Sequence, residues 1–108
     1  MDFRGKLILA PLAGITDTTF RLLCRENGAD AVLTEMASAK GLLMQPERTR
    51  RFLEYSEGER PVGAQLFGAV PDEIGEAAAA AAAMGFDFLD INMGCPVRKV
   101  TGGGAGAA

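Results

Sequence analysis

The sequence contains no histidine and no tryptophan among its 108 residues, and it has only two cysteines. Without histidine, these residues cannot supply a Ser-His-Asp triad, a Cys-His dyad or a histidine-ligated metal site. Cys24 and Cys95 lie far apart and form no Cys-x-x-Cys motif, so neither a disulfide framework nor a zinc site is expected. We therefore predict no metal and a reducing, cytoplasmic environment.

Long apolar runs and an excess of positive charge are also missing. No stretch approaches the ~20 apolar residues of a membrane span, and Pro11 interrupts the short apolar run near the N-terminus, which argues against a signal peptide. We expect no membrane association. The net charge is −3, so the surface is not basic overall, although a local basic patch stays compatible with it.

What is present is an alternation of short apolar runs and helical stretches, which indicates a βαβαβαβ order. The apolar runs predict strands at residues 7–10, 31–35, 62–67 and 86–91. Thr16 or Asp17 can cap a first helix that Gly28 ends. Residues 37–55 are predicted to be mixed helical, with Pro46 opening a second short helix, and an alanine-rich helix runs from Pro71 to Gly85.

The first predicted helix carries Phe20, Leu23 and Cys24 on one face, which predicts that this face is buried. Cys24 is therefore expected to be a small core residue and not a reactive thiol. Basic residues cluster at positions 48–51 and 98–99, where solvated surfaces are the simplest explanation.

The strands predict a parallel sheet, because runs such as residues 7–10 are apolar on both faces. Two architectures fit this pattern, an open doubly wound sheet and a (β/α)8 barrel. A complete barrel takes about 250 residues, so the chain corresponds to roughly half of one, truncated after the strand at 86–91. The glycine-rich tail, residues 102–108, is a flexible linker, a phosphate-binding loop or the start of a fourth helix. The usual nucleotide-binding fingerprints are absent.

Chemistry in α/β folds collects at the carboxyl ends of the strands, and several notable residues fall there. Pro11, Leu12 and Ala13 form a turn that a flat ligand can approach closely, or an ordinary βα turn. Glu35 is either a buried site carboxylate or a solvated loop acid. Gln65 interrupts an apolar run, and its buried amide needs a planar heterocycle or a backbone carbonyl as its partner.

The segment from Asp90 to Val100 is the most informative part of the chain. Asp90 and Asn92 lie two residues apart and share a face of the last predicted strand, where they meet a ligand or bond neighbouring strands and caps. Cys95 follows in a Gly-Cys-Pro turn and can act as an acid, a nucleophile or a ligand. The adjacent basic residues at 98–99 favour its thiolate, whereas burial favours the neutral thiol.

Taken together, four motifs resemble the N-terminal half of the tRNA-dihydrouridine synthases. They are Ala-Pro-Leu-Ala-Gly-Ile-Thr-Asp-Thr-Thr-Phe-Arg (10–21), Thr-Glu-Met (34–36), Gln-Leu-Phe-Gly (65–68) and Asp-Ile-Asn-Met-Gly-Cys-Pro-Val-Arg-Lys-Val (90–100) with the glycine-rich tail. The motifs occur in the family's order and cover essentially the whole chain, and Asn-Met-Gly-Cys-Pro is the most specific of them.

The resemblance implies an FMN-dependent (β/α)8 barrel that reduces uridines of tRNA to dihydrouridine, with NADPH or NADH as the reductant. It implies that Pro11, Leu12 and Ala13 lie against the isoalloxazine ring and that Gln65 bonds the flavin's pyrimidine edge. Asn92 would lie near the flavin and the target base. FMN would deliver a hydride from N5 to C6 of the uracil, and Cys95 would supply the proton to C5.

The resemblance also implies that residues 1–108 are the N-terminal half of the FMN-binding barrel domain. The family's later strands, which supply a lysine and the FMN phosphate site, and its helical tRNA-binding domain would lie outside these residues. We therefore expect the 108-residue piece to be inactive alone and tRNA to be bound mainly by the other parts. Its open sheet edges would permit self-association.

Two alternatives share parts of this sequence pattern. A dihydroorotate-dehydrogenase-like flavin barrel acting on a free pyrimidine would share the turn and the strand-end polar residues. A non-catalytic α/β module that binds a ligand or partner would share the fold pattern alone.

Overall fold

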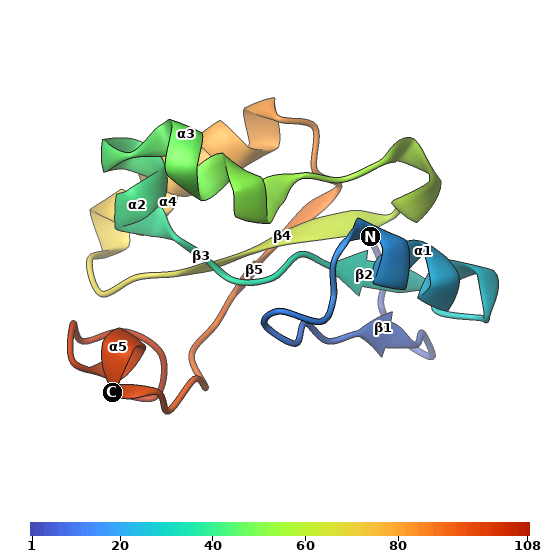
Figure 1. Ribbon diagram of the computed structural model, residues 1–108, viewed down its shortest axis with the longest axis horizontal. Helices are drawn as coiled ribbons and strands as arrows, with labels where there is room; N and C mark the ends of the chain where they lie inside the picture. Colours follow the sequence, from blue (N-terminus) through green and yellow to red (C-terminus); the bar gives the residue numbers. More distant parts are fainter.

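The computed structural model describes residues 1–108 and contains a single parallel sheet with helices packed beside it (Figure 1). The strands are β1 (Ile8–Leu9), β2 (Ala31–Leu33), β3 (Ala37–Ser38), β4 (Val62–Phe67) and β5 (Phe88–Ile91). The helices are α1 (Thr18–Glu26), α2 (Ala39–Met44), α3 (Pro46–Thr49), α4 (Pro71–Ala83) and α5 (Arg98–Thr101), with 3₁₀ turns η1 (Arg50–Leu53) and η2 (Glu57–Glu59).

Every pair of neighbouring strands is parallel, and their spatial order follows the chain. β1 pairs with β2, both β2 and β3 pair with β4, and β4 pairs with β5. Because β2 and β3 are two pieces of one extended segment, the sheet is a sequential series of four strands. This order is the one by which a barrel grows, whereas a doubly wound sheet reverses its direction part-way.

The segment formed by β2 and β3 carries a bulge at its centre. Leu33 pairs with Gly63, but Ala37 pairs with Leu66, so four steps along one strand match three along the other. Thr34 lies in the bulge, where its Oγ1 accepts the Gln65 backbone N–H at 3.2 Å. That hydroxyl replaces a partner that the extra residue removes from the ladder.

The prediction of a helical segment starting at residue 37 is therefore wrong at its first two residues. Ala37 and Ser38 extend the preceding strand before α2 begins, and Ser38 caps that helix by accepting the Gly41 N–H. The predicted strands at 7–10, 31–35 and 86–91 are shorter in the structure, while the strand at 62–67 has the predicted bounds.

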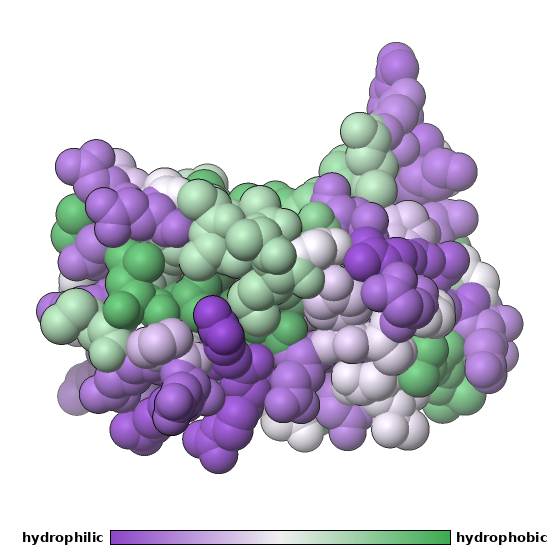
Figure 2. Space-filling model, turned by 90° about the horizontal axis from the view of Figure 1, so that it is seen from above, coloured by the Kyte–Doolittle hydropathy of each residue, from purple (hydrophilic) through white to green (hydrophobic).

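Helices α2, α3 and α4 lie above strands β3 to β5 in Figure 1, and the buried core cluster takes residues from both the helices and the strands. Alanines on α4 permit a close approach to the sheet, and Ala77 and Ala81 are completely buried. Seen from above, the molecule has an apolar area bordered by hydrophilic side chains (Figure 2). The core cluster consists of Val32, Ala37, Ala39, Leu42, Leu53, Val62, Ala64, Leu66, Ala77, Ala81 and Phe86.

The ends of the two longest helices follow the local sequence signals. Asp17 caps α1 by accepting the Phe20 N–H at 2.8 Å, and Pro71 occupies the first turn of α4. Gly28 and Gly85 follow α1 and α4 with φ of 108° and 95°, a conformation that favours glycine. None of the helices has both the length and the apolar character that a membrane crossing requires.

Candidate active site at the carboxyl end of the sheet

A cavity of about 410 Å³ lies between the turn after β1, Gln65 on β4 and the loop after β5. The six residues to which the family resemblance assigns a role all line it, although they come from three separate segments, whereas the candidates Glu35 and Asp90 do not. Met36, Gly94 and Pro96 complete the lining, and no charged side chain takes part. The full set is Pro11, Leu12, Ala13, Met36, Gln65, Asn92, Gly94, Cys95 and Pro96.

The turn after β1 is held in shape by its own hydrogen bonds. The backbone N–H groups of Ile15 and Thr16 donate to the Leu12 carbonyl at 2.9 and 3.0 Å. The buried Thr16 hydroxyl accepts the Leu12 N–H at 3.0 Å. Glu35 accepts the Gly14 N–H and does not line the cavity, so it serves as a tie between this turn and the bulged strand.

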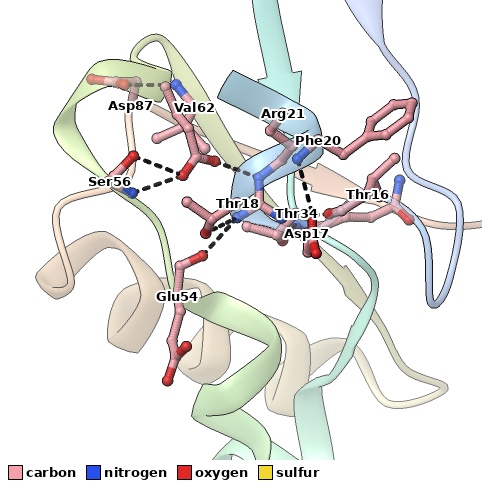
Figure 3. Close-up of polar contacts among 12 residues, drawn as sticks. Thr16, Asp17, Thr18, Phe20, Arg21, Thr34, Glu54, Ser56, Val62 and Asp87 are labelled. Carbon is pink, nitrogen blue, oxygen red and sulfur yellow. Dashed lines mark hydrogen bonds and ion pairs between the residues drawn. The ribbon is translucent and has the colours of Figure 1, made fainter. Parts of the chain in front are cut away.

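Arg21 supports the same turn from behind (Figure 3). Its Nη1 donates to the Thr16 carbonyl at 2.6 Å, and its Nη2 donates to the Glu54 carbonyl at 2.7 Å. Its Nε forms an ion pair with Glu59, whose other oxygen accepts the Ser56 N–H at 2.7 Å. The guanidinium therefore joins the start of α1 to the residues that precede β4.

This arrangement overturns the predicted buried face of α1. Arg21 is the buried residue of that helix, whereas Leu23 is 54% exposed and Cys24 is only half-buried. The apolar periodicity gave no sign of this, because the partner of Arg21 lies 38 positions away in the chain.

The side chains of Gln65 on β4, Asp90 on β5 and Asn92 just after β5 form a continuous series of hydrogen bonds, and Gln65 and Asn92 line the cavity. Gln65, which is 7% exposed, lies opposite Asp90 in the parallel ladder and donates from Nε2 to Asp90 Oδ2 at 2.7 Å. Its Oε1 accepts from Asn92 Nδ2 at 3.1 Å. The partners of the Gln65 amide are thus side chains of the neighbouring strand, and no backbone carbonyl is involved.

The loop that carries Cys95 is fixed on both sides of that residue. Asn92 Oδ1 accepts the backbone N–H groups of Gly94 and Cys95, each at 3.0 Å. On the other side, the Ala107 N–H donates to the Cys95 carbonyl at 2.9 Å. The glycine-rich tail is therefore no free linker: after α5 it folds back on the loop and buries Ala105.

Met36 also lines the cavity, although its sequence pattern predicted no role for it. It follows the bulge, and its Sδ lies 3.6 Å from Asn92 Nδ2. The Thr-Glu-Met motif at 34–36 indicated that this strand end lies near the site. It did not indicate which of the three side chains lines the cavity, because that depends on the bulge.

Charged pairs gather at the opposite, amino-terminal end of the sheet. Arg60 bonds both Glu57 and Asp87, and Asp87 also accepts the Val62 N–H at 2.8 Å. The hydrogen bond between Arg60 and Glu57 lowers the pKa of Glu57 and is the largest cause of the raised pKa of Arg60. One end of the sheet is thus tied by ion pairs, while the cavity at the other end is lined by neutral groups.

Sequentially ordered parallel strands, with a cavity at their carboxyl ends, define the chain as an α/β protein of the (β/α)-barrel type. Residues 8–108 match the family model described as dihydrouridine synthase. The chain belongs to the dihydrouridine synthase family.

Curated relatives agree with this assignment. The chain is 41% identical over 104 residues to tRNA-dihydrouridine synthase B of Pseudomonas aeruginosa, and this alignment covers 96% of the chain and 31% of that protein. It is 44% identical over 102 residues to a probable tRNA-dihydrouridine synthase of Aquifex aeolicus, covering 93% and 32%. A probable tRNA-dihydrouridine synthase of Rhizobium leguminosarum is 42% identical over 108 residues, covering 100% and 34%. The chain thus spans about a third of the length of these relatives.

Proposed function

We propose that residues 1–108 form the N-terminal half of the FMN-binding barrel domain of a cytoplasmic tRNA-dihydrouridine synthase. The reaction would reduce the C5–C6 bond of uridines in tRNA, with NADPH or NADH as the reductant. The observation that carries this proposal is the single cavity shared by Pro11, Leu12, Ala13, Gln65, Asn92 and Cys95.

The cavity suits the ring system of a flavin. Its volume of about 410 Å³ lies within the usual range for small-molecule sites. An amide carries two N–H donors and an oxygen with two lone pairs. After its bonds to Asp90 and Asn92, Gln65 therefore keeps one donor and one acceptor for a heterocycle edge. The uncharged lining fits a neutral ring, so the FMN phosphate would need a cation from another part of the protein.

FMN, when bound, would supply the hydride. Cys95 would transfer the proton of its thiol to C5 of the uracil and would be reprotonated from solvent as the resulting thiolate. Asn92 would keep the thiol in place, because its Oδ1 holds the Cys95 N–H. Pro11, Leu12 and Ala13 would present a flat surface to the ring.

Transfer RNA is the proposed substrate because the curated relatives are named for it. A uridine must leave its stack to reach an enclosed site, at a cost of a few kcal/mol. Arg98 and Lys99 are exposed on α5, just beyond the Cys95 loop, where they would contact RNA phosphates. Other parts of the protein would bind most of the tRNA.

A chimera tests the assignment, with this chain replacing the matching segment of the Pseudomonas aeruginosa relative. We expect it to bind FMN and to form dihydrouridine in tRNA. Cys95→Ala should leave flavin reduction by NADPH intact and lower product formation by a factor of about 10² or more. Cys24→Ala is the matched control and should retain product formation. Full activity of Cys95→Ala would overturn the acid role, and failure of Gln65→Ala to weaken FMN retention would overturn the cofactor contact.

A further inference from the structure

The side chains of Asp90, Gln65 and Asn92 connect β5 to the backbone of the Cys95 loop. Asp90 Oδ2 accepts from Gln65 Nε2 at 2.7 Å, Gln65 Oε1 accepts from Asn92 Nδ2 at 3.1 Å, and Asn92 Oδ1 accepts the Cys95 N–H at 3.0 Å. Every bond in this series runs in the same direction, from a donor nearer the loop to an acceptor nearer Asp90.

The two ends of the series determine that direction. An ionised carboxylate only accepts hydrogen bonds, so Asp90 requires the amino side of the Gln65 amide to face it. The Gln65 oxygen then faces Asn92 and requires the amino side of that amide in turn. The Asn92 oxygen is left for the N–H groups of Gly94 and Cys95, which can only donate.

We propose that Asp90 is a positioning residue of the active site, which sets the orientation of the Gln65 and Asn92 amides and thereby holds the Cys95 loop. Asp90 does not line the cavity and touches no reacting atom. Its effect reaches the ligand through Gln65. The remaining donor and acceptor of Gln65 have fixed positions only when its side-chain amide cannot flip and exchange its nitrogen and oxygen. The effect of Asp90 reaches the thiol through Asn92.

The ladder register explains why a carboxylate is available at this point. Gln65 and Asp90 are direct partners in the parallel pair of β4 and β5, so their side chains project from the same face. Gln65 is buried, and an amide without partners at such a place is costly. The hydrogen bond to a charged acceptor is stronger than a bond to a neutral one, which favours one amide orientation over the other.

The inference rests on the proposed function for what the cavity binds, but its test does not require flavin. Iodoacetamide modification of the 108-residue chain is followed by peptide mass spectrometry, with Cys24 as the internal reference. Asp90→Leu should speed modification of Cys95 relative to Cys24 about tenfold, because the loop loses a hydrogen-bonded support. Asp90→Asn keeps an acceptor oxygen without the charge and should fall between the parent and Asp90→Leu.

Asp87→Asn is the matched control. Asp87 also bonds β4, through the Val62 N–H, but at the other end of the sheet. It should leave the ratio of Cys95 to Cys24 modification unchanged. An unchanged ratio in Asp90→Leu, or an equal increase in Asp87→Asn, would overturn the proposal. If Asp90→Leu does not fold, Asp90→Asn decides alone: a faster ratio supports the role and the parental ratio overturns it.

FMN retention by the chimera separates this inference from the proposed function. Asp90→Leu should weaken retention about tenfold when the parent binds FMN, because Gln65 loses its fixed orientation. A parent chimera that binds no FMN would overturn the proposed function, and the labelling ratio would still decide the role of Asp90. Retention unchanged by Asp90→Leu would overturn the effect on Gln65.

Discussion

Arg21 and Glu59 form an ion pair that is almost completely shielded from water, with side chains 3% and 0% exposed. The pair lies directly behind the turn that contributes Pro11, Leu12 and Ala13 to the cavity, because Arg21 also bonds the Thr16 carbonyl. Local folding at α1 is thereby linked to the residues that lead into β4.

Removing one partner of this pair should be strongly destabilising. Arg21→Met or Glu59→Leu leaves a buried charge without its counterion, and we expect each to lower the free energy of unfolding by about 3–5 kcal/mol. The double variant should lose less than the sum of the two, since no unpaired charge remains. Urea denaturation followed by circular dichroism measures all three.

The exposed pair of Arg4 and Asp2 provides the control, with side chains 92% and 62% exposed. Arg4→Ala should leave the urea midpoint almost unchanged, because water screens an exposed ion pair. Additive losses in the Arg21 and Glu59 double variant would show that the ion pair is not the source of the stability.

Gly106 allows the tail to fold back on the Cys95 loop. Its φ is 60°, and an added Cβ would lie 2.4 Å from the Cys95 carbonyl oxygen. Gly106→Ala should therefore destabilise the fold by about 2 kcal/mol or more and expose Cys95 to faster alkylation. Gly103→Ala, whose Cβ would meet only the Val100 carbonyl oxygen at 3.8 Å, should have neither effect. Equal thiol reactivity in the two variants would contradict this role of the tail.

Thr34 supplies the hydroxyl that satisfies the Gln65 backbone N–H at the bulge. Thr34→Val keeps the shape but removes the acceptor, which should cost about 1–3 kcal/mol and speed hydrogen exchange at the Gln65 amide. Thr34→Ser retains the hydroxyl and should keep that amide protected. A slow-exchanging Gln65 amide in the valine variant would show that another group accepts the bond.

Gly63 makes room for the ring of Phe88, since an added Cβ would lie 2.3 Å from Phe88 Cε2. The ring is itself packed against Phe3, with centroids 5.0 Å apart. We expect Gly63→Ala to lower the free energy of unfolding by about 1–3 kcal/mol, and we expect Phe88→Leu to relieve part of that loss.

Gly75 lies in α4 with open space around it, so Gly75→Ala should instead raise the free energy of unfolding by up to about 1 kcal/mol.

The parts of the fold set by local chemistry were predictable. Pro71 and the alanine run after it gave the start of α4, and Asp17 gave the cap of α1. Six of the cavity residues were also predictable, because the carboxyl ends of parallel strands lie along one edge and the segments at β1, β4 and β5 each carry a polar or proline-rich signal. The roles assigned to those residues remain predictions.

What the sequence could not provide depends on pairing between distant segments. The two residues of β3 have no strand signal of their own and are extended because β4 offers them partners. Arg21 has an unremarkable place on its helix, and its burial follows from Glu59. The contact of Ala107 with Cys95 arises only once α5 has reversed the chain.

The bulge at Thr34 changes how side chains alternate between the two faces of the sheet along this strand. Val32 and Ala37 are five residues apart, so in a regular strand their side chains would project from opposite faces. Both belong to the same core cluster, because the extra residue resets the alternation between them. A one-residue deletion within 34–36 would therefore restore the regular ladder with β4, and Val32 and Ala37 would stay on the core face as the bulge disappears. The deletion would instead remove the local geometry in which the Thr34 hydroxyl meets the Gln65 N–H, so the extra residue serves the hydrogen bonding at the bulge and not the direction of the core side chains.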